Sequence, residues 1–176
     1  MIYLFFDTET TGFGADARLV SIAWQIWNNE KFIKQKYFII KPENFKIPAS
    51  ATKIHGITTE YALKKGQNLR KIMLEFEKDL RKSDLLIAHN YKYDYRIVFN
   101  EMDRLNIKSV LPQKKYFDTM INGQKIFRLP KWPKLSELYF MLMGKDFNNK
   151  HNAQADVNAT VRIFFELKKR NLLPKI

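Results

Sequence analysis

Two carboxylic acids stand two residues apart in the segment FFDTETTG, where an apolar run ends in Asp7 and Glu9 before a Thr-Thr-Gly turn. Side chains at positions i and i+2 of a β-strand point to the same face, so the two carboxylates are expected to converge. Adjacent negative charges are costly unless a cation or a shared proton neutralises them, and oxygen-only ligands suit Mg²⁺ or Mn²⁺. The pair therefore predicts a divalent metal site. The alternative is that one acid caps the turn while the other is solvated.

Two further segments add acidic residues and a histidine. Asp94, in AHNYKYDYRIV, falls in the first turn of an expected helix and is predicted to point toward the core. The helix dipole alone also favours acids in first helical turns. In HNAQADVNATVRIFF, His151 and Asp156 lie five residues apart, which predicts His151 just before a helix, where it can lean over the carboxylates, and Asp156 inside it. An isolated histidine at a helix entry is more often a surface or capping residue.

The elements that must position these residues follow from the apolar pattern. Runs rich in Ile, Val, Phe, Tyr and Trp predict the early strands, with a hairpin turn around Asn29, and two shorter apolar runs predict strands later in the chain. The predicted strands cover residues 2–7, 18–27, 31–40, 85–88 and 115–118. A strand meander followed by alternating helices and strands predicts an α/β domain with a mixed sheet.

Three helices are predicted from residues at helical spacing. The first covers residues 68–82. The second is predicted to be capped by Asn90, and its apolar stripe is Tyr95, Val98, Phe99, Met102 and Leu105. The last is predicted to be capped by Asn152 and to reach about Lys169, and its buried face is Ala153, Val157, Thr160, Val161 and Phe164.

Composition limits the class of protein. The 176 residues, 45% of them apolar, are enough for one globular domain, so we expect a single domain over 1–176. The formal net charge of +13 favours a polyanionic partner such as nucleic acid, although a solvated basic surface is the simpler reading. The lack of cysteine excludes disulfides and thiolate sites and is compatible with an intracellular, cytoplasmic protein. No segment has the pattern of a signal peptide or of a membrane helix.

Taken together, the acidic residues and His151 resemble, in order and local sequence, the histidine branch of the DEDD 3′–5′ exonucleases. This family includes the proofreading epsilon subunit of bacterial replicative polymerases, oligoribonuclease and ribonuclease T. The matching segments are FDTETTG at 6–12, IHGIT at 54–58, AHNYKYD at 88–94 and HNAQAD at 151–156. The tyrosine branch has Tyr four residues before the last Asp, where this chain has Asn152, so that branch is excluded. Tyr93 and Val157 replace the usual Phe and Ala without touching an expected ligand.

The resemblance implies a ribonuclease H-like fold with a five-stranded mixed sheet flanked by helices. It also implies hydrolysis of single-stranded nucleic acid from the 3′ end to nucleoside 5′-monophosphates. In such an enzyme Asp7, Glu9, Asp94 and Asp156 would hold two Mg²⁺ or Mn²⁺ ions about 3.5–4 Å apart. His151 would accept the proton of the attacking water, a task for which a group that titrates near neutral pH is suited.

Substrate contacts are also expected from the resemblance. The residues that would hold the terminal nucleotide are Thr8, Thr10, Thr11, His55 and Ile57. The simpler reading of the last two is an ordinary loop histidine and a core isoleucine. Before the last motif, basic and aromatic groups alternate and are expected either to follow a single strand or, for the aromatics, to belong to the core. These residues are Lys131, Trp132, Lys134, Lys145, Phe147 and Lys150.

Two other functions share part of this pattern. A haloacid dehalogenase-type phosphatase also begins with an acid at the end of a first strand, but it needs Asp where this chain has Glu9. A nucleic-acid-binding module with an inactive site would need altered geometry, since every expected ligand is present. The sequence does not separate DNA from RNA, or proofreading from repair and RNA turnover. Because the chain ends soon after the last helix, at Ile176, we expect it to work alone or as a homodimer rather than through a tail bound to a polymerase.

Overall fold

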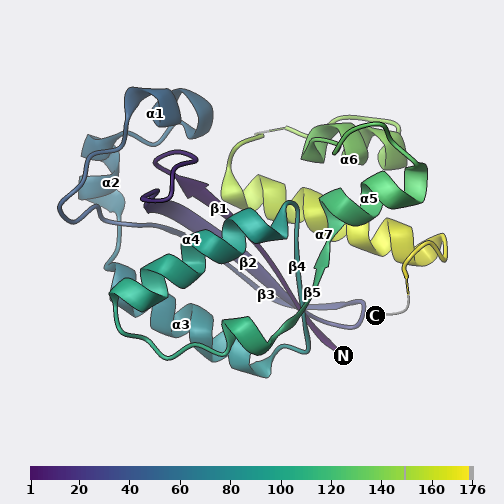
Figure 1. Ribbon diagram of the computed structural model, residues 1–176, viewed down its shortest axis with the longest axis horizontal. Coiled ribbons are helices and arrows are strands. Elements are labelled where there is room, and N and C mark those ends of the chain that lie inside the picture. Colours follow the sequence, from purple (N-terminus) through teal and green to yellow (C-terminus); the bar gives the residue numbers. More distant parts are fainter. Residues whose placement is uncertain (149, 175–176) are drawn as a thin grey trace.

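The computed structural model describes residues 1–148 and 150–174 and consists of a five-stranded sheet with helices on both faces (Figure 1). The strands are β1 (Ile2–Thr10), β2 (Leu19–Asn28), β3 (Lys31–Ile39), β4 (Leu85–Ala88) and β5 (Lys115–Asp118). The helices are α1 (Ala49–His55), α2 (Thr59–Lys65), α3 (Leu69–Lys82), α4 (Tyr91–Arg104), α5 (Thr119–Phe127), α6 (Leu135–Met143) and α7 (Ala153–Lys169), with a 3-10 turn η1 (Leu111–Gln113). Within the described residues, no helix combines the length and the apolar character that crossing a membrane requires.

The N-terminal strand lies in the middle of the sheet, whose order is β3-β2-β1-β4-β5. β2 runs antiparallel to both β1 and β3, whereas β1, β4 and β5 are parallel. The β2–β3 hairpin turns at Asn29, whose φ of 51° lies in the left-handed region that asparagine tolerates. The predicted α/β class with a mixed five-stranded sheet is therefore confirmed.

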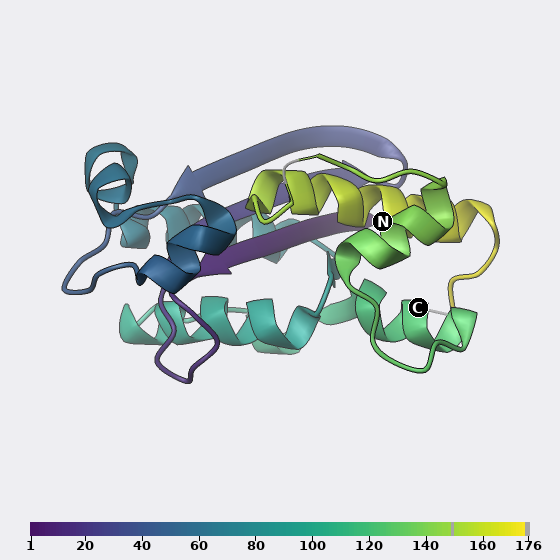
Figure 2. The same ribbon diagram turned by 90° about the horizontal axis from the view of Figure 1, so that it is seen from above.

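The alternation of side chains along β1 divides the core into two layers. Leu4 and Phe6 point to the face covered by α3 and α4. Tyr3 and Phe5 point to the opposite face and pack edge-on against Phe164 of α7. Figure 2 shows β1 between these two layers of helices. The same alternation decides to which side each acid at the end of β1 points.

Most predicted elements are found close to their expected bounds. The strands at 85–88 and 115–118 coincide with β4 and β5, and the last helix ends at Lys169 as expected. The helix predicted over 68–82 begins one residue later, because Asn68 is its N-cap and accepts a hydrogen bond from the backbone N–H of Lys71.

One expectation about a helix is corrected, and four of the helices were not expected. Val98 and Met102 of α4 are buried as predicted, but Phe99 is 37% exposed and lies outside the core. The sequence interpretation also contains no counterpart of α1, α2, α5 or α6. These helices are only seven to nine residues long, so they carry too few turns for an apolar period to be recognised.

Candidate active site

The acids of β1 point toward α7. Asp7 and Glu9 share the strand face of Tyr3 and Phe5, and α7 covers that face with Asp156 in its first turn. One oxygen of each of the three carboxyl groups lies within 4.8 Å of the other two. The structure thus brings together three of the four predicted metal ligands from the two ends of the sequence.

Local hydrogen bonds fix the position of Asp156. The side chain of Asn152 accepts from the backbone N–H groups of Gln154 and Ala155, at 3.1 and 3.3 Å, which confirms the predicted N-cap. One carboxylate oxygen of Asp156, Oδ2, accepts from the backbone N–H of His151 at 3.1 Å. The other, Oδ1, is buried and has no hydrogen-bond partner among the described residues. A buried acceptor without a donor is costly, so a ligand bound to this oxygen would stabilise it.

Asp94 reaches the site from the other side of β1. Thr8 lies between the two acids of the strand and points toward α4, so it donates from Oγ1 at 2.6 Å and from its backbone N–H at 3.1 Å to Asp94 Oδ1. The carboxyl group of Asp94 is buried and contributes to raising the pKa of Asp7. It lies outside the group of three converging carboxylates. The fourth predicted ligand is therefore adjacent to the other three, with one oxygen engaged by Thr8.

The start of α4, which carries Asp94, is fixed by Asp118 at the end of β5. The carboxylate of Asp118 accepts from the backbone N–H groups of Asn90 at 3.1 Å and Tyr91 at 3.0 Å, and also from Met120 of α5 at 2.9 Å. Asn90 has a φ of 68° and its side chain makes no capping bond. Asn90 therefore occupies the N-cap position as predicted, but the hydrogen-bond acceptor comes from Asp118 on a neighbouring strand, which local sequence does not indicate.

Burial raises the pKa of every acid in this group, and repulsion by neighbouring carboxylates adds to the rise for Asp7, Glu9 and Asp94. Burial first, and then the charges of Asp94, Asp156 and Glu9, hold the pKa of Asp7 well above its usual range. Burial is also the main cause for the others: it raises the pKa of Glu9 and of Asp94 to about 8, and that of Asp156 to about 7. The ion pairs of the described residues all involve other acids.

This set of donors fits a divalent metal ion. It offers carboxylate oxygens, one of which is buried without a partner, and its repulsion would be relieved by a cation. Hard oxygen donors of this kind suit Mg²⁺ or Mn²⁺. Since the chain contains no cysteine, a metal site with thiolate ligands is excluded.

His151 lies at the edge of this group. It precedes the N-cap of α7, as predicted, and its φ of 62° places it in the left-handed region. Its side chain is exposed and lines the cleft described below. Among the described residues, the hydrogen bond that joins His151 to the acids comes from its backbone N–H rather than from the imidazole.

A cleft of about 730 Å³ opens at the three carboxylates. One wall is the turn that follows β1, where Phe13 is 79% exposed. Ile54 and His55 at the end of α1 contribute a second wall. A third wall is the loop before α6, with Trp132 62% exposed, followed by Lys134. Phe13 and Ile54 were not identified from the sequence as part of the site, although Phe13 directly follows one segment that carries the resemblance and Ile54 begins another.

Four of the five predicted nucleotide contacts line the cleft: Thr8, Thr10, Thr11 and His55. The hydroxyl of Thr10 is hydrogen-bonded to that of Tyr93 and that of Thr11 accepts from the backbone N–H of Arg18 at 2.9 Å, so both are engaged within the protein. His55 is different, because its Nε2 is buried and has no partner among the described residues. Its contact with a nucleotide stays a prediction, as do those of the threonines.

The prediction for Ile57 is corrected. Ile57 is only 6% exposed, packs with Val20 and Ile47 in a small apolar cluster, and is not part of the cleft wall. The backbone explains this, because α1 ends at Gly56 with a φ of 76° and the chain then turns inward. Ile54, 48% exposed on α1, occupies the wall instead.

The basic and aromatic residues before the last motif were expected either to follow a single strand or, for the aromatics, to belong to the core. Lys134, Lys150 and Trp132 line the cleft, whereas Lys131 and Lys145 do not. Phe147 also lines it, but its ring packs edge-on against Tyr139 at 5.1 Å between centroids and so belongs partly to the core.

A partly buried histidine at the cleft wall, whose role sequence reasoning missed, holds the loop that carries Trp132. His89 Nε2 donates to the backbone carbonyl of Pro133 at 3.1 Å, and its Nδ1 accepts from Thr119 Oγ1 at 2.9 Å. Burial lowers the pKa of His89 to about 4, so the ring is neutral at physiological pH. Because a carbonyl only accepts, the single ring proton is on Nε2. The only signal in the sequence was its place in the AHN segment.

Comparisons with known proteins agree with this geometry. Residues 4–164 match the model of the RNase_T family, described as an exonuclease. The chain is 28% identical over 129 residues to DNA polymerase III subunit epsilon of Buchnera aphidicola subsp. Schizaphis graminum, which covers 69% of this chain and 54% of that protein. It is 45% identical over 60 residues to an uncharacterized exonuclease of Escherichia phage 186, which covers 34% of this chain and 29% of that protein. The chain thus spans about half or less of the length of these relatives.

Solved structures of exonuclease I from E. coli share the fold. The zinc-bound complex with single-stranded DNA superimposes with a TM-score of 0.82 at 24% identity, covering 96% of this chain and 41% of that one. The complex with a dT13 oligonucleotide gives a TM-score of 0.81 at 24% identity, covering 97% and 41%. The ribonuclease H-like fold implied by the sequence is therefore confirmed. Since the family model matches most of its length, the chain belongs to the exonuclease family, as a DnaQ-like member of the DEDD group.

Proposed function

We propose that this protein is a metal-dependent 3′–5′ exonuclease that hydrolyses single-stranded nucleic acid and releases nucleoside 5′-monophosphates. The observation that carries the proposal is the group of converging carboxylates, Asp7, Glu9 and Asp156, at an open cleft in a chain of the exonuclease family. We propose further that residues 1–176 act as one exonuclease domain.

Four acids would hold the metal ions in this function: Asp7, Glu9, Asp94 and Asp156. Two Mg²⁺ or Mn²⁺ ions bound there would supply stabilisation of negative charge on the attacking and leaving oxygens of the phosphodiester. The protein's own contribution is to bury these acids and to orient them through Thr8 and the N-terminus of α7. Asp94 would keep the hydrogen bonds that its Oδ1 accepts from Thr8 and would offer its second oxygen, Oδ2, to a metal ion.

His151 is proposed as the general base. Its exposed imidazole stands on the cleft wall, one residue before the N-cap of the helix that carries Asp156. From there it would take the proton of the attacking water, which a histidine does well near neutral pH. His89, which is partly buried and neutral, would instead keep the opposite wall in place.

Single-stranded DNA is the proposed substrate. The cleft offers the exposed rings of Phe13 and Trp132 for base stacking and Lys134 for phosphate, and the net charge of +13 favours a polyanion. The exonuclease I structures, which share the fold, hold DNA oligonucleotides. His55 Nε2, buried at the cleft wall, would contact the terminal nucleotide, together with the polar groups of Thr10 and Thr11.

The decisive test is the degradation of single-stranded DNA and RNA of equal sequence, each labelled at the 5′ end, in Mg²⁺, Mn²⁺ or EDTA. We expect a ladder that shortens from the 3′ end, is lost in EDTA and is lost in Asp7→Ala. His151→Ala should retain metal binding, measured by calorimetry, but lose most of the cleavage. DNA should be preferred over RNA. Gel filtration, alone and with a replicative polymerase, would show whether the active species is a monomer, a homodimer or a polymerase subunit.

Other outcomes point elsewhere. Tight binding of oligonucleotides without cleavage in either metal would favour an inactive binding module. Neither binding nor cleavage, combined with hydrolysis of a phosphomonoester such as p-nitrophenyl phosphate, would favour the phosphatase.

A further inference from the structure

A second cavity lies beside the proposed active site, on the outer side of α4. It has a volume of about 360 Å³ and is lined by Tyr91, Lys92, Tyr95, Leu111, Pro112, Lys114 and Tyr116, which together are called the α4–β5 surface. Asn90 and Tyr93 line the active-site cleft, while Tyr91 and Lys92, their neighbours in the chain, line this second cavity. The first turn of α4 therefore separates the two.

Aromatic rings form a row on this surface. Tyr116 of the edge strand β5 stacks on Tyr91, with ring centroids 4.0 Å apart and planes within 3°. Along α4, Tyr95 lies beside Tyr91 and stacks on Phe99 at 5.7 Å. Tyr91 is 4% exposed and serves the core, but Tyr116 is 49% exposed, so much of its ring is open to solvent. An open aromatic face of this kind is what nucleobases stack on.

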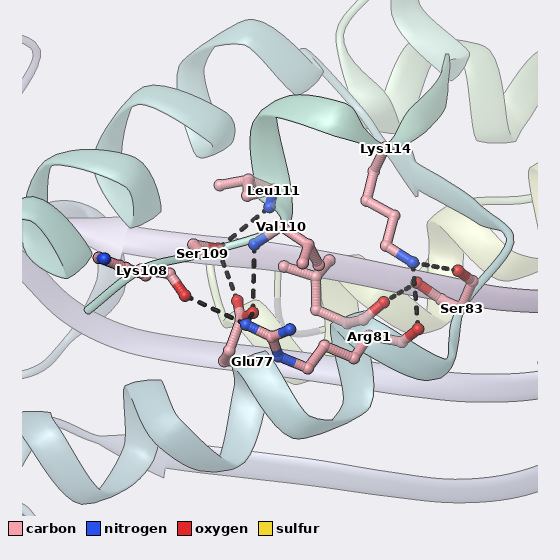
Figure 3. Close-up of polar contacts among 9 residues, drawn as sticks. Glu77, Arg81, Ser83, Lys108, Ser109, Val110, Leu111 and Lys114 are labelled. Atoms are coloured by element: carbon pink, nitrogen blue, oxygen red, sulfur yellow. Dashed lines mark hydrogen bonds and ion pairs between the residues drawn. The ribbon is translucent and has the colours of Figure 1, made fainter.

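Cations accompany the rings. Lys92 is exposed on the first turn of α4, and no acid lines the cavity. Lys114 donates to the backbone carbonyls of Arg81 and Ser83, where it joins the α4–β5 surface to the end of α3 (Figure 3). Beyond it lies a groove of about 530 Å³ with one acid, Glu77, and five basic residues: Arg70, Lys78, Arg81, Lys82 and Lys108.

The groove is held in shape by Glu77, whose carboxylate accepts from the backbone N–H of Val110 at 3.1 Å and pairs with Arg81 at 2.8 Å (Figure 3). Arg81 also donates to the backbone carbonyl of Lys108 at 3.2 Å. A guanidinium fixed in this way retains further N–H groups for an anion. Stacking rings followed by fixed and free cations are complementary to a single strand of nucleic acid.

We propose that the α4–β5 surface binds the part of a single strand that lies on the 5′ side of the cleft, with a base stacked on Tyr116 and phosphates on Lys92 and the basic groove. This inference rests on the proposed exonuclease function, because a strand whose 3′ end occupies the cleft must leave it in the 5′ direction. The surface then makes the enzyme favour long strands over fragments that only fill the cleft.

The test compares binding of a twelve-nucleotide and a three-nucleotide oligothymidylate to the full chain in EDTA, where cleavage is absent, by fluorescence anisotropy. Tyr116→Leu keeps apolar cover over Tyr91 and removes the stacking face. We expect it to weaken binding of the long strand about tenfold, with little effect on the short one. Tyr116→Phe should bind as the original protein does. Lys92→Gln should lower the slope of log affinity against log salt by about 0.7.

The matched control is Phe32→Leu, because Phe32 is 48% exposed on β3, the opposite edge of the sheet. Thermal unfolding checks that each variant is folded. Equal weakening of both oligonucleotides by Tyr116→Leu, the same loss with Phe32→Leu, or no loss at all would overturn the proposal. Cleavage of a dinucleotide in Mg²⁺ tests the proposed function separately, because that substrate does not reach the α4–β5 surface.

Discussion

The buried acids of this protein form two groups that differ in their surroundings. At the end of α3, Glu77 is 5% exposed and is met by a hydroxyl, a backbone N–H and the guanidinium of Arg81. At the end of β1, Asp7, Glu9 and Asp156 face one another, and burial raises the pKa of each. The first arrangement stabilises the fold, whereas the second opposes it. Buried acids that lack partners are therefore the better indicator of a functional site.

The largest expected effect is the loss of cleavage activity when an acid at the end of β1 loses its charge. Asp156→Asn should reduce cleavage of single-stranded DNA by a factor on the order of 10³, because several kcal/mol of charge stabilisation is lost with a metal ligand. In EDTA and above about pH 7, where Asp156 is ionised, the same variant should unfold at a higher temperature than the original protein, since one repelling charge is gone. Cleavage assays measure the loss of activity, and thermal unfolding in EDTA measures the change in stability. Full activity, or a lower unfolding temperature, would contradict the assignment.

Glu77→Ala should show the opposite pattern. The backbone N–H of Val110 and the hydroxyl of Ser109 would lose a buried acceptor, so the free energy of unfolding should fall by about 2–3 kcal/mol. Cleavage of a dinucleotide at 25 °C should stay unchanged, because the residue is remote from the cleft. Urea denaturation measures the free energy of unfolding. A variant that keeps its stability but loses activity would show that the two groups are not distinct.

The pH dependence of stability follows from the same difference. The folded protein holds protons on Glu9, Asp94 and Asp156 up to about pH 7 to 8, whereas these acids ionise near pH 4 when unfolded. A raised pKa contributes stability below the unfolded value, and this contribution is lost as pH rises through the folded value. In EDTA, the unfolding temperature should therefore drop by several degrees between pH 5 and 9. Added Mg²⁺ should reverse the drop, most strongly at high pH. A flat profile in EDTA would refute this.

The smallest effect is expected at Asp118, which has features of both groups. Burial raises its pKa, yet its carboxylate accepts several backbone N–H bonds at the starts of α4 and α5. Asp118→Asn keeps one acceptor oxygen, so it should cost about 1 kcal/mol of stability. Activity should fall a few-fold, because α4 carries Asp94. Asp118→Ala removes both acceptor oxygens, so its losses of stability and of cleavage activity should be larger than those of Asp118→Asn.

The sequence predicted the elements that carry strong local signals. The apolar runs of β4 and β5 and the long stripe of α7 were located to within a residue, and Asn152 was correctly placed at the start of α7. Four of the site residues were grouped from their motifs, and three of them converge. What could not be predicted depends on contacts between distant segments. The donor for Asp94 comes from Thr8, and the acceptor at the start of α4 comes from Asp118.

The errors have a common physical origin. Ile57 was expected to touch substrate because its motif adjoins the site, but the turn at Gly56 carries it into the core. His89 was not singled out, since only the folded chain shows that it holds Pro133. In each case the backbone path or a tertiary hydrogen bond decides the role of the side chain, and residue type and spacing do not encode either.

The central position of β1 has a consequence for synthesis of the protein. The first strand carries Asp7 and Glu9, but its parallel neighbour β4 begins at Leu85 and the remaining acid of the cluster stands at position 156. In a growing chain Asp7 and Glu9 therefore emerge from the ribosome long before Asp156, and the proposed set of metal ligands is complete only when the first turn of α7 has been made. Fragments that end before Asp156 would lack part of this proposed set and should therefore bind divalent metal more weakly.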